Sequence, residues 1–290
     1  MTGTTKLPAA LARAITTAEI DAYHRDGATV IRDVIPDGWI NLMRDAVDRI
    51  LADPGPASLE YTDEGKSGRY YGDFFIWMRD PDFKAFMMES PLPDLAQQVM
   101  KASTVNFFYD QLLVKEPNTA EPTPWHQDDP YYFVSGMQNV SFWVPLDPVE
   151  EATLRCVAGS HRWEKPVLPT RWLSEENFYP DPDAYLPVPD PDAEGMEIRE
   201  FAMQPGDALA FHFRCLHGAH GNETSRRRRA FSLRLLGDDA CYTERPGRTS
   251  PPFPGHGMTQ GQRLREDWFP VLYPADQTGS SPSSEMKNQA

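Results

Sequence analysis

In the first hundred residues, apolar positions recur with the spacing of helices. The segment Thr16-Thr17-Ala18-Glu19 has the form of a capping box, in which a threonine and a glutamate three residues later close the first turn. Apolar residues three and four apart continue after it, and prolines or glycines end each run. The pattern predicts helices over residues 16–27, 37–54, 83–88 and 92–100, with a short apolar strand at 28–34.

After residue 104 the pattern changes to short β-branched and aromatic runs bounded by glycine, proline, asparagine or aspartate. Such spacing is typical of a β-sandwich or barrel. Strands are expected over residues 105–115, 138–146, 154–157, 196–203, 208–213 and 230–236. Helices first and strands second indicate one α+β domain over residues 1–275.

Two segments do not fit this pattern of strands. The region near residues 164–195 is rich in proline and aspartate, and it is too long for an ordinary connection, so we expect a lid-like insertion over the site. The tail over residues 276–290 is rich in serine, glycine, glutamine and asparagine, and disorder is expected there.

Composition narrows the class of partner. Asp and Glu number 43 against 28 Lys and Arg, and a net charge of −15 disfavours a nucleic-acid partner. No apolar run is long enough to span a bilayer, and no secretory signal opens the chain, so a cytoplasmic protein that does not act on membranes is expected. Cys156, Cys215 and Cys241 lack the spacing of a zinc site or disulfide framework, which predicts three free thiols. The oligomeric state is left open, a homodimer being one alternative.

The segment Trp125-His126-Gln127-Asp128 carries the first chemical signal. On a strand, positions 126 and 128 point the same way, so an imidazole and a carboxylate would converge on one point. They form two corners of a 2-His-1-carboxylate site, which suits Fe(II) with open positions for other ligands. By itself His-x-Asp occurs often by chance, and the third corner must come from the segment 211–222, which holds His212, His217 and His220.

Four consecutive arginines, 226–229, precede the predicted strand 230–236. An arginine at the start of that strand would face inward, beside the metal site. There its guanidinium group could clamp the distal carboxylate of a dicarboxylic co-substrate with two parallel hydrogen bonds.

These motifs occur in a recognisable order. His-x-Asp is followed by Gly-Ser-His-Arg-Trp at 159–163, by Pro-Gly-Asp at 205–207, and by His-Gly-Ala with a later asparagine and arginine at 217–228. Over residues 16–240 the chain resembles the phytanoyl-CoA dioxygenase family of Fe(II)/2-oxoglutarate oxygenases. The resemblance implies a double-stranded β-helix core (a jelly roll, cupin-like) flanked by N-terminal helices, with Fe(II), 2-oxoglutarate as co-substrate, and O₂.

The resemblance also assigns roles to individual residues. His217, directly before Gly-Ala, is the distal iron ligand, and Arg228, eleven residues later, binds 2-oxoglutarate, with Arg226 as its main rival. Further co-substrate contacts are expected from three residues on neighbouring predicted strands and turns, namely Gln111, Thr153 and Trp143; simple core packing is the alternative for Trp143.

The remaining histidines receive other roles. Strand alternation places His212 on the face opposite His217, where it is packed or exposed, and His220 lies in the turn that follows and is expected to face solvent. The resemblance gives His161 a structural or supporting role rather than a place among the metal ligands.

Asp128 also bears on the reaction. Relatives that halogenate carry a small residue here, so a carboxylate indicates hydroxylation, or desaturation, ring closure or epimerisation, with release of succinate and CO₂. Two other functions share these ligands: a zinc-dependent hydrolase, for which the sequence singles out no general base, and a catalytically inactive binding protein, for which all four key residues would be unnecessary.

The substrate class is less defined. Because the chain is acidic and its arginine cluster is committed to the co-substrate, we expect a free small molecule rather than a CoA ester. Tyr131 and Tyr132 are the first candidates for substrate contact, since they directly follow the metal-binding loop. Other aromatic residues could form either substrate walls or core, namely Phe74, Phe75, Trp77 and Phe133.

Overall fold

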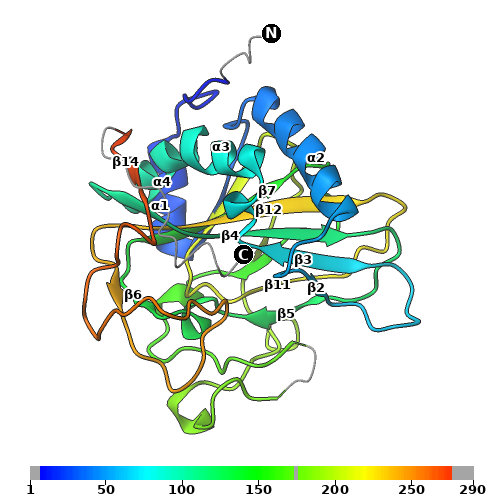
Figure 1. The fold of residues 1–290 in the computed structure, drawn as a ribbon. Helices are drawn as coiled ribbons and strands as arrows, with labels where there is room; N and C mark the ends of the chain where they lie inside the picture. The colour runs from blue at the N-terminus through cyan, green and yellow to red at the C-terminus, as the bar shows by residue number, and fades with distance from the viewer. Residues whose placement is uncertain (1–6, 173–175, 276–290) are drawn as a thin grey trace.

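A computed structural model describes residues 7–172 and 176–275 (Figure 1). The order of the chain is helices first and strands second, as predicted. The helices are α1 (Thr17–Asp26), α2 (Asp37–Ala52), α3 (Pro81–Glu89) and α4 (Leu92–Met100). The expected disorder of residues 276–290 concerns a segment outside the described residues.

Antiparallel strands form a large sheet of eight strands and a smaller one of four. The large sheet has the order β1 (Ala28–Ile31), β10 (Ala208–Phe211), β7 (Asn139–Pro145), β12 (Arg228–Leu236), β4 (Val105–Lys115), β3 (Tyr70–Phe74) and β2 (Leu59–Glu60), with β14 (Val271–Tyr273) also paired to β4. The smaller sheet has the order β5 (Thr123–His126), β11 (His217–Ala219), β8 (Arg155–Val157) and β9 (Ile198–Glu200). A separate pair joins β6 (Val134–Ser135) to β13 (Cys241–Tyr242).

The first helix begins as its sequence predicts. The Thr16 hydroxyl accepts from the Glu19 backbone N–H, the Glu19 carboxylate accepts from the Thr16 N–H, and Gly27 ends the helix in the left-handed conformation at φ +80°. A side chain at this position would also collide with the His161 ring, because a Cβ would lie 2.3 Å from Nδ1. The helix caps, and the lack of room for a side chain at Gly27, therefore fix the turn into β1.

The helices cover the outer face of the large sheet, and the smaller sheet lies on the other side (Figure 1). Phe231 of β12 points outward, and its ring packs edge-on against Phe83 and Phe86 of α3, with centroids 5.1 and 5.5 Å apart. Burying such aromatic rings stabilises the layer by roughly 1.5–3 kcal/mol each. The helices therefore leave the inner face of the sheet free for a site.

Alternation along β12 decides which side chains face inward. Phe231, Leu233 and Leu235 belong to the core beneath the helices, whereas Ala230 belongs to the cluster between the two sheets. The inner positions of β12 therefore include Arg228, Ser232 and Arg234, and all three line one cavity. Three polar side chains among the four inner positions of a mostly apolar strand mark a functional surface.

Asp110 is a buried acid on the outer face of β4. Its Oδ2 accepts from the Trp77 backbone N–H at 3.0 Å, whereas its Oδ1 has no partner among the described residues. Burial raises the pKa of Asp110 to about 7, against a partial opposing effect of the Trp77 N–H. The folded state thus binds this proton more tightly than the unfolded state, so the side chain lowers the free energy of unfolding as pH rises from about 4 through 7.

Replacing Asp110 with asparagine removes that ionisation and keeps the size of the side chain. We expect the variant to gain stability over the native protein at pH 8, by at most about 4 kcal/mol, and to gain little at pH 5. Thermal unfolding followed by circular dichroism at both pH values measures the difference. A variant that changes the melting temperature equally at pH 5 and pH 8 would contradict this explanation.

The segment after residue 240, where the family resemblance ended, completes the fold. Strand β14 pairs with β4, and the Ser250 N–H donates to the Tyr131 carbonyl at 3.0 Å. The Phe253 ring stacks on Phe108 with centroids 5.5 Å apart. This segment therefore closes one side of the inner face.

The predicted lid region is mostly irregular where it is described. It contains a short 3-10 turn, η4 (Pro182–Ala184), and isolated bridges join Val167 to Leu186 and Thr170 to Asn177. A lid function for residues 164–195 stays a prediction, although residues of this region line the cavity.

The thiol prediction is confirmed, since Cys156 and Cys215 are buried, Cys241 is half-buried, and all three are free. Within residues 7–172 and 176–275, no helix has the length and apolar character needed to cross a membrane.

Candidate metal centre and cavity

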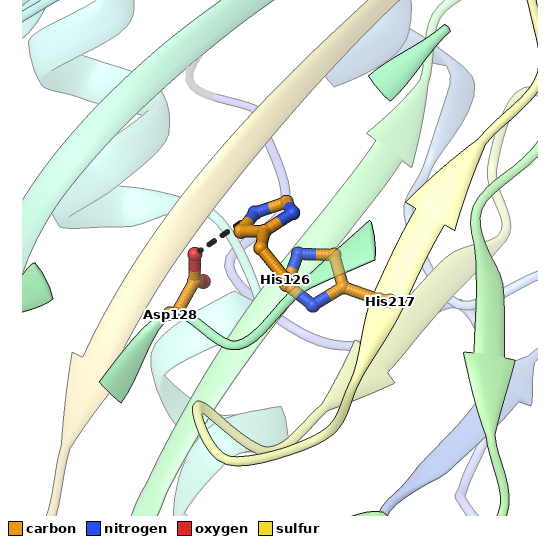
Figure 2. Close-up of side chains that lie close together, drawn as sticks. All are labelled: His126, Asp128 and His217. Atoms are coloured by element: carbon orange, nitrogen blue, oxygen red, sulfur yellow. Dashed lines mark ion pairs between the residues drawn. The ribbon is translucent and has the colours of Figure 1, made fainter. Parts of the chain in front are cut away.

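Two strands of the smaller sheet bring the predicted metal ligands together. His126 ends β5, His217 begins β11, and the two residues are direct partners in the antiparallel register. Their ring centroids are 4.1 Å apart. Asp128 follows at once, and its Oδ1 lies 3.7 Å from His126 Nε2 (Figure 2). One ligand atom from each of the three residues fits within 4.8 Å of the others, and all three side chains are buried.

Asp128 reaches this point differently from the way the sequence suggested. Strand β5 stops at His126, and Asp128 has helical torsions, with φ −70° and ψ −41°, at the start of the 3-10 turn η2 (Asp129–Tyr131). Strand alternation is therefore the wrong reason for the convergence. A tight turn aims the carboxylate back at the imidazole instead.

Hydrogen bonds fix the ring orientation of both histidines. His126 Nδ1 lies 2.7 Å from the Pro124 carbonyl, and His217 Nδ1 lies 2.9 Å from the Cys215 carbonyl. A carbonyl only accepts, so each Nδ1 carries the proton and each Nε2 keeps its lone pair for a metal. Such carbonyl partners are typical of histidines that ligate a metal.

Electrostatics keep Asp128 and His217 in the protonation states that a metal requires. Burial raises the pKa of Asp128, but the Arg234 guanidinium and the two histidines outweigh it and hold that pKa well below its usual range. Burial, together with His126, lowers the pKa of His217 to about 3. At neutral pH the site therefore offers one carboxylate and a neutral His217 imidazole.

A cavity of about 730 Å³ opens in front of the triad. Its walls come from the inner face of the large sheet, from the predicted lid region and from the segment after residue 240. Trp172 packs edge-on against the His126 ring at 4.7 Å, and the Tyr131 hydroxyl donates to the Thr170 carbonyl at 2.7 Å. The lid region is thus tied to the metal-binding turn.

Of the four consecutive arginines, Arg228 is the one that enters the cavity. Arg226 is exposed, Arg227 pairs with Glu116, and Arg229 pairs with Asp147. The Arg228 side chain is buried, and burial lowers its pKa. Of the two candidates Arg228 and Arg226, Arg228 therefore faces the cavity and Arg226 does not.

The Arg228 guanidinium lacks the partners that a buried charge normally has. Its Nε and Nη2 have no hydrogen-bond partner among the described residues, and the guanidinium group lies over the face of Trp143, 5.5 Å from the ring centroid. A buried cation costs free energy unless an anion or acceptor pairs with it. The arrangement fits a ligand carboxylate between Arg228 and the triad.

Of the other residues predicted to contact the co-substrate, two line the cavity and one does not. Gln111 and Trp143 line the cavity, but Thr153 does not; its neighbour Leu154 does, and the Thr153 hydroxyl lies 3.5 Å from the Leu154 carbonyl. Tyr131 and Tyr132 both line the cavity, as expected of substrate contacts.

Of the aromatic residues that were candidates for the walls of a substrate site, some line the cavity and others belong to the core. Phe74 and Phe75 line the cavity, whereas Trp77 and Phe133 are buried in the core beneath the helices and do not line it.

The remaining histidines lie apart from the triad. His212 is packed, with its Nε2 3.1 Å from the Met137 carbonyl, and His220 is exposed. His161 is buried with its Nε2 3.2 Å from the His24 carbonyl. The structure therefore brings His217 alone of these four to the candidate metal centre.

Sequence reasoning missed Arg234 and Ser232. Both follow Arg228 at even spacing on β12, so alternation from Arg228 would have placed them on the inner face. Arg234 Nε lies 3.7 Å from Asp128 Oδ2, and the buried Ser232 hydroxyl has no partner among the described residues. Their signal in the sequence was an arginine and a serine at inward positions of an apolar strand.

Comparison with known proteins decides the family. A sequence profile of the phytanoyl-CoA dioxygenase (PhyH) family matches residues 23–230, which is more than half of the chain. The chain belongs to this family. The predicted family and enzyme class, an Fe(II)/2-oxoglutarate-dependent dioxygenase, are thereby confirmed.

Individual relatives agree with the family. The phytanoyl-CoA dioxygenase family member described here is 25% identical over 247 residues to dioxygenase OlcK of Penicillium canescens, covering 79% of this chain and 74% of that protein. It resembles the carbocyclase SnoK of nogalamycin biosynthesis with a TM-score of 0.70 and 20% identity, over 92% of this chain and 100% of that one.

A second solved structure shows the same fold with ligands. It is the epimerase SnoN in complex with Fe³⁺, α-ketoglutarate and nogalamycin RO, with a TM-score of 0.70, 21% identity, and coverage of 88% of this chain and 97% of that one. The expected jelly-roll fold is confirmed, and the expected cofactors agree with the family and with the triad. Roles of individual residues stay predictions.

Proposed function

We propose that this family member hydroxylates a small organic molecule at an iron held by His126, Asp128 and His217, with 2-oxoglutarate as co-substrate. The observation that carries the proposal is the buried triad, whose ligand atoms fit within 4.8 Å and whose two histidines keep Nε2 for a metal. Two imidazoles and one carboxylate are the ligand set of non-haem Fe(II) oxygenases.

The bound iron, 2-oxoglutarate and O₂ supply the oxidising chemistry, and succinate and CO₂ are released. The protein's part is to hold and orient these groups. Ser141 Oγ donates to Asp128 Oδ2 at 3.3 Å, and Arg234 lies on the same oxygen at 3.7 Å, so Oδ1 is left to face His126 and the metal. A carboxylate at this position supports hydroxylation, or a related oxidation, over halogenation.

Arg228 is proposed to bind the distal carboxylate of 2-oxoglutarate. Support comes from its unpaired, buried guanidinium group and from its place on the same cavity as the triad. Bidentate pairing with a carboxylate would satisfy these donors. Trp143 would pack beneath the co-substrate, since Arg228 lies 5.5 Å over its ring.

Gln111 is proposed as a second co-substrate contact. Its Oε1 accepts from Arg234 Nη2 at 2.8 Å, which fixes the amide with its NH₂ group toward the Tyr61 hydroxyl, and Tyr61 lines the same cavity. Gln111 also lies opposite Ser232 in the register of β4 and β12, between the two arginines.

The substrate is proposed to be a free small molecule that contacts Tyr131 and Tyr132. A cavity of about 730 Å³ is of the size that holds one such ligand. The structurally similar carbocyclase SnoK is from nogalamycin biosynthesis, and the SnoN complex holds nogalamycin RO.

The location is proposed to be cytoplasmic, with no nucleic-acid partner. The three free cysteines suit a reducing compartment, and the net charge of −15 disfavours a phosphate backbone.

A zinc hydrolase is disfavoured by the walls of the cavity. Among the described residues that line it, Asp128 is the only carboxylate, and it already belongs to the triad. A hydrolase would need a further base to activate water.

Metal exchange tests the proposed function. After removal of metal with a chelator, Fe(II) is expected to restore 2-oxoglutarate-dependent succinate formation and O₂ consumption, and Zn(II) to restore neither. Slow turnover without a prime substrate is enough for this readout, so the substrate need not be known. Succinate formation that Zn(II) supports as well as Fe(II), or no succinate formation with Fe(II), would exclude the proposed reaction.

A further inference from the structure

Arg234 is a second buried arginine on the cavity, and the metal ligands do not account for it. Its Nη2 donates to Gln111 Oε1 at 2.8 Å and its Nε donates to the Tyr132 hydroxyl at 3.2 Å. The guanidinium group lies over the Tyr109 ring at 4.7 Å. Its Nη1 has no hydrogen-bond partner among the described residues.

The two tyrosines next to Arg234 also have one O–H group between them that is not used as a donor. The hydroxyls of Tyr109 and Tyr132 bond to each other. Two hydroxyl groups hold two protons, and one bond between them uses one proton. The second proton has no hydrogen-bond acceptor among the described residues, whichever tyrosine carries it, because Arg234 can only donate. Burial raises the pKa of both tyrosines, so both remain protonated at neutral pH.

We call Arg234, Tyr109 and Tyr132 the donor cluster. It lies away from Arg228, since the two arginines stand six residues apart on β12, about 20 Å along the strand, with Ser232 between them. Arg234 contacts Asp128, whereas Arg228 contacts Trp143. The co-substrate carboxylate at Arg228 would therefore leave the donor cluster unmatched.

Charge leads to the same conclusion. Two positive charges of Fe(II) are balanced by Asp128 and one carboxylate of 2-oxoglutarate, and the second carboxylate is balanced by Arg228. Arg234 shares the single negative charge of Asp128, 3.7 Å away, with the iron, so one net positive charge remains in the buried site. Buried charges are normally paired, so an anion is the expected partner.

The charges of the residues that line the cavity also favour an anionic ligand. Four arginines line it, at positions 171, 228, 234 and 248, against the one carboxylate of Asp128 among the described lining residues. This excess of positive charge occurs in a chain whose net charge is −15. Arg171 and Arg248 are exposed, which suits the capture of an anion from solution.

Apolar groups make up the remaining walls near the donor cluster. Phe74, Phe75 and Phe178 line the cavity together with Pro251 and Pro252. Flat aromatic and proline surfaces favour a ring-bearing body over a polar one.

We propose that the donor cluster binds a carboxylate-like anionic oxygen group of the substrate, which is therefore an apolar, ring-bearing organic acid. The inference rests on the proposed function in one respect, because it places that oxygen group beside the iron. The binding preference itself does not depend on the metal.

The experiment compares matched probes with the native protein and with Arg234→Gln. Benzoate, cinnamate and 2-naphthoate are titrated by calorimetry under anaerobic conditions, in the presence of Fe(II) and saturating 2-oxoglutarate, and so are benzyl alcohol, cinnamyl alcohol and 2-naphthylmethanol. At least one acid is expected to bind about tenfold more tightly than its alcohol, as one charge-assisted hydrogen bond implies. Arg234→Gln should remove that preference and leave the affinity for the alcohol within about threefold, at a 2-oxoglutarate concentration that a separate titration shows to be saturating for the variant.

Further variants keep the test decisive. Arg234→Lys should retain part of the preference, because it keeps the charge without the planar fork. If Arg234→Gln does not fold, as judged by circular dichroism, the double variant Tyr109→Phe with Tyr132→Phe takes its place and should weaken binding of the acid but not of the alcohol.

Three results would overturn the proposal: acids that bind no better than their alcohols, no acid binding at all, or an Arg234→Gln effect equal for acid and alcohol. Failure of the proposed function is separate from these. It would appear as an absence of 2-oxoglutarate and Fe(II) binding by the native protein, and the preference for acids can then still be measured on the metal-free protein.

Discussion

Replacing His217 with alanine is expected to lower 2-oxoglutarate turnover by about a thousandfold or more, because changes in groups that merely support a ligand already cost ten- to a hundredfold. His217 is a buried member of the triad, and its Nδ1 is committed to the Cys215 carbonyl. Loss of its Nε2 leaves two ligands, too few to hold iron firmly. Succinate formation and iron content after gel filtration measure the effect.

His220→Ala is the matched control. This histidine lies three residues further along the same segment, and its side chain is exposed. Iron content and turnover in this variant should equal those of the native protein within about twofold, as for most exposed substitutions. Equal loss in both variants, or full iron content in His217→Ala, would contradict the assignment of the triad.

The second large effect is expected at Arg228. Arg228→Gln should raise the Kd for 2-oxoglutarate by about a hundredfold, because truncating a buried charge partner costs about 2–5 kcal/mol. Iron binding should persist, since Arg228 is not one of the three ligands and lies over the Trp143 ring instead. Calorimetric titration of the iron-loaded protein with 2-oxoglutarate under anaerobic conditions measures the change.

Arg226→Gln provides the control for charge. It removes one positive charge two residues earlier, at an exposed position outside the main cavity. An unchanged Kd in Arg226→Gln and a large increase in Arg228→Gln are predicted. If both variants bind 2-oxoglutarate like the native protein, the co-substrate carboxylate lies elsewhere, and Arg234 becomes the next candidate.

Much of the fold could be predicted because its signals are local. The capping box at Thr16 and Glu19 and the prolines that bound α2 act within a few residues. Strand β4 was predicted over 105–115 and found there, since it is rich in valine, aromatic residues and leucine and has no proline or glycine within it. The triad was predictable for another reason: the order of several motifs along the chain matched a family.

The features that could not be predicted from the sequence depend on contacts between segments far apart in the chain. The register of β12 against β4 brings Arg234 opposite Tyr109, and residues of the segment after residue 240 line the cavity. Neither arrangement has a signal in the local sequence. The turn at Asp128 was misread as a strand, because alternation and a tight turn can aim two side chains at one point equally well. Thr153 failed to reach the cavity since the side chain of Leu154 occupies that wall.

The central claim is that His126, Asp128 and His217 hold an iron to which 2-oxoglutarate binds. Anaerobic addition of Fe(II) and 2-oxoglutarate to the metal-free protein tests it most directly, because chelation of the keto acid by Fe(II) produces a charge-transfer band in visible light. The native protein and Arg226→Gln should show the band, and His126→Ala and His217→Ala should not. A native protein without the band, or triad variants that keep it unchanged, would contradict the claim.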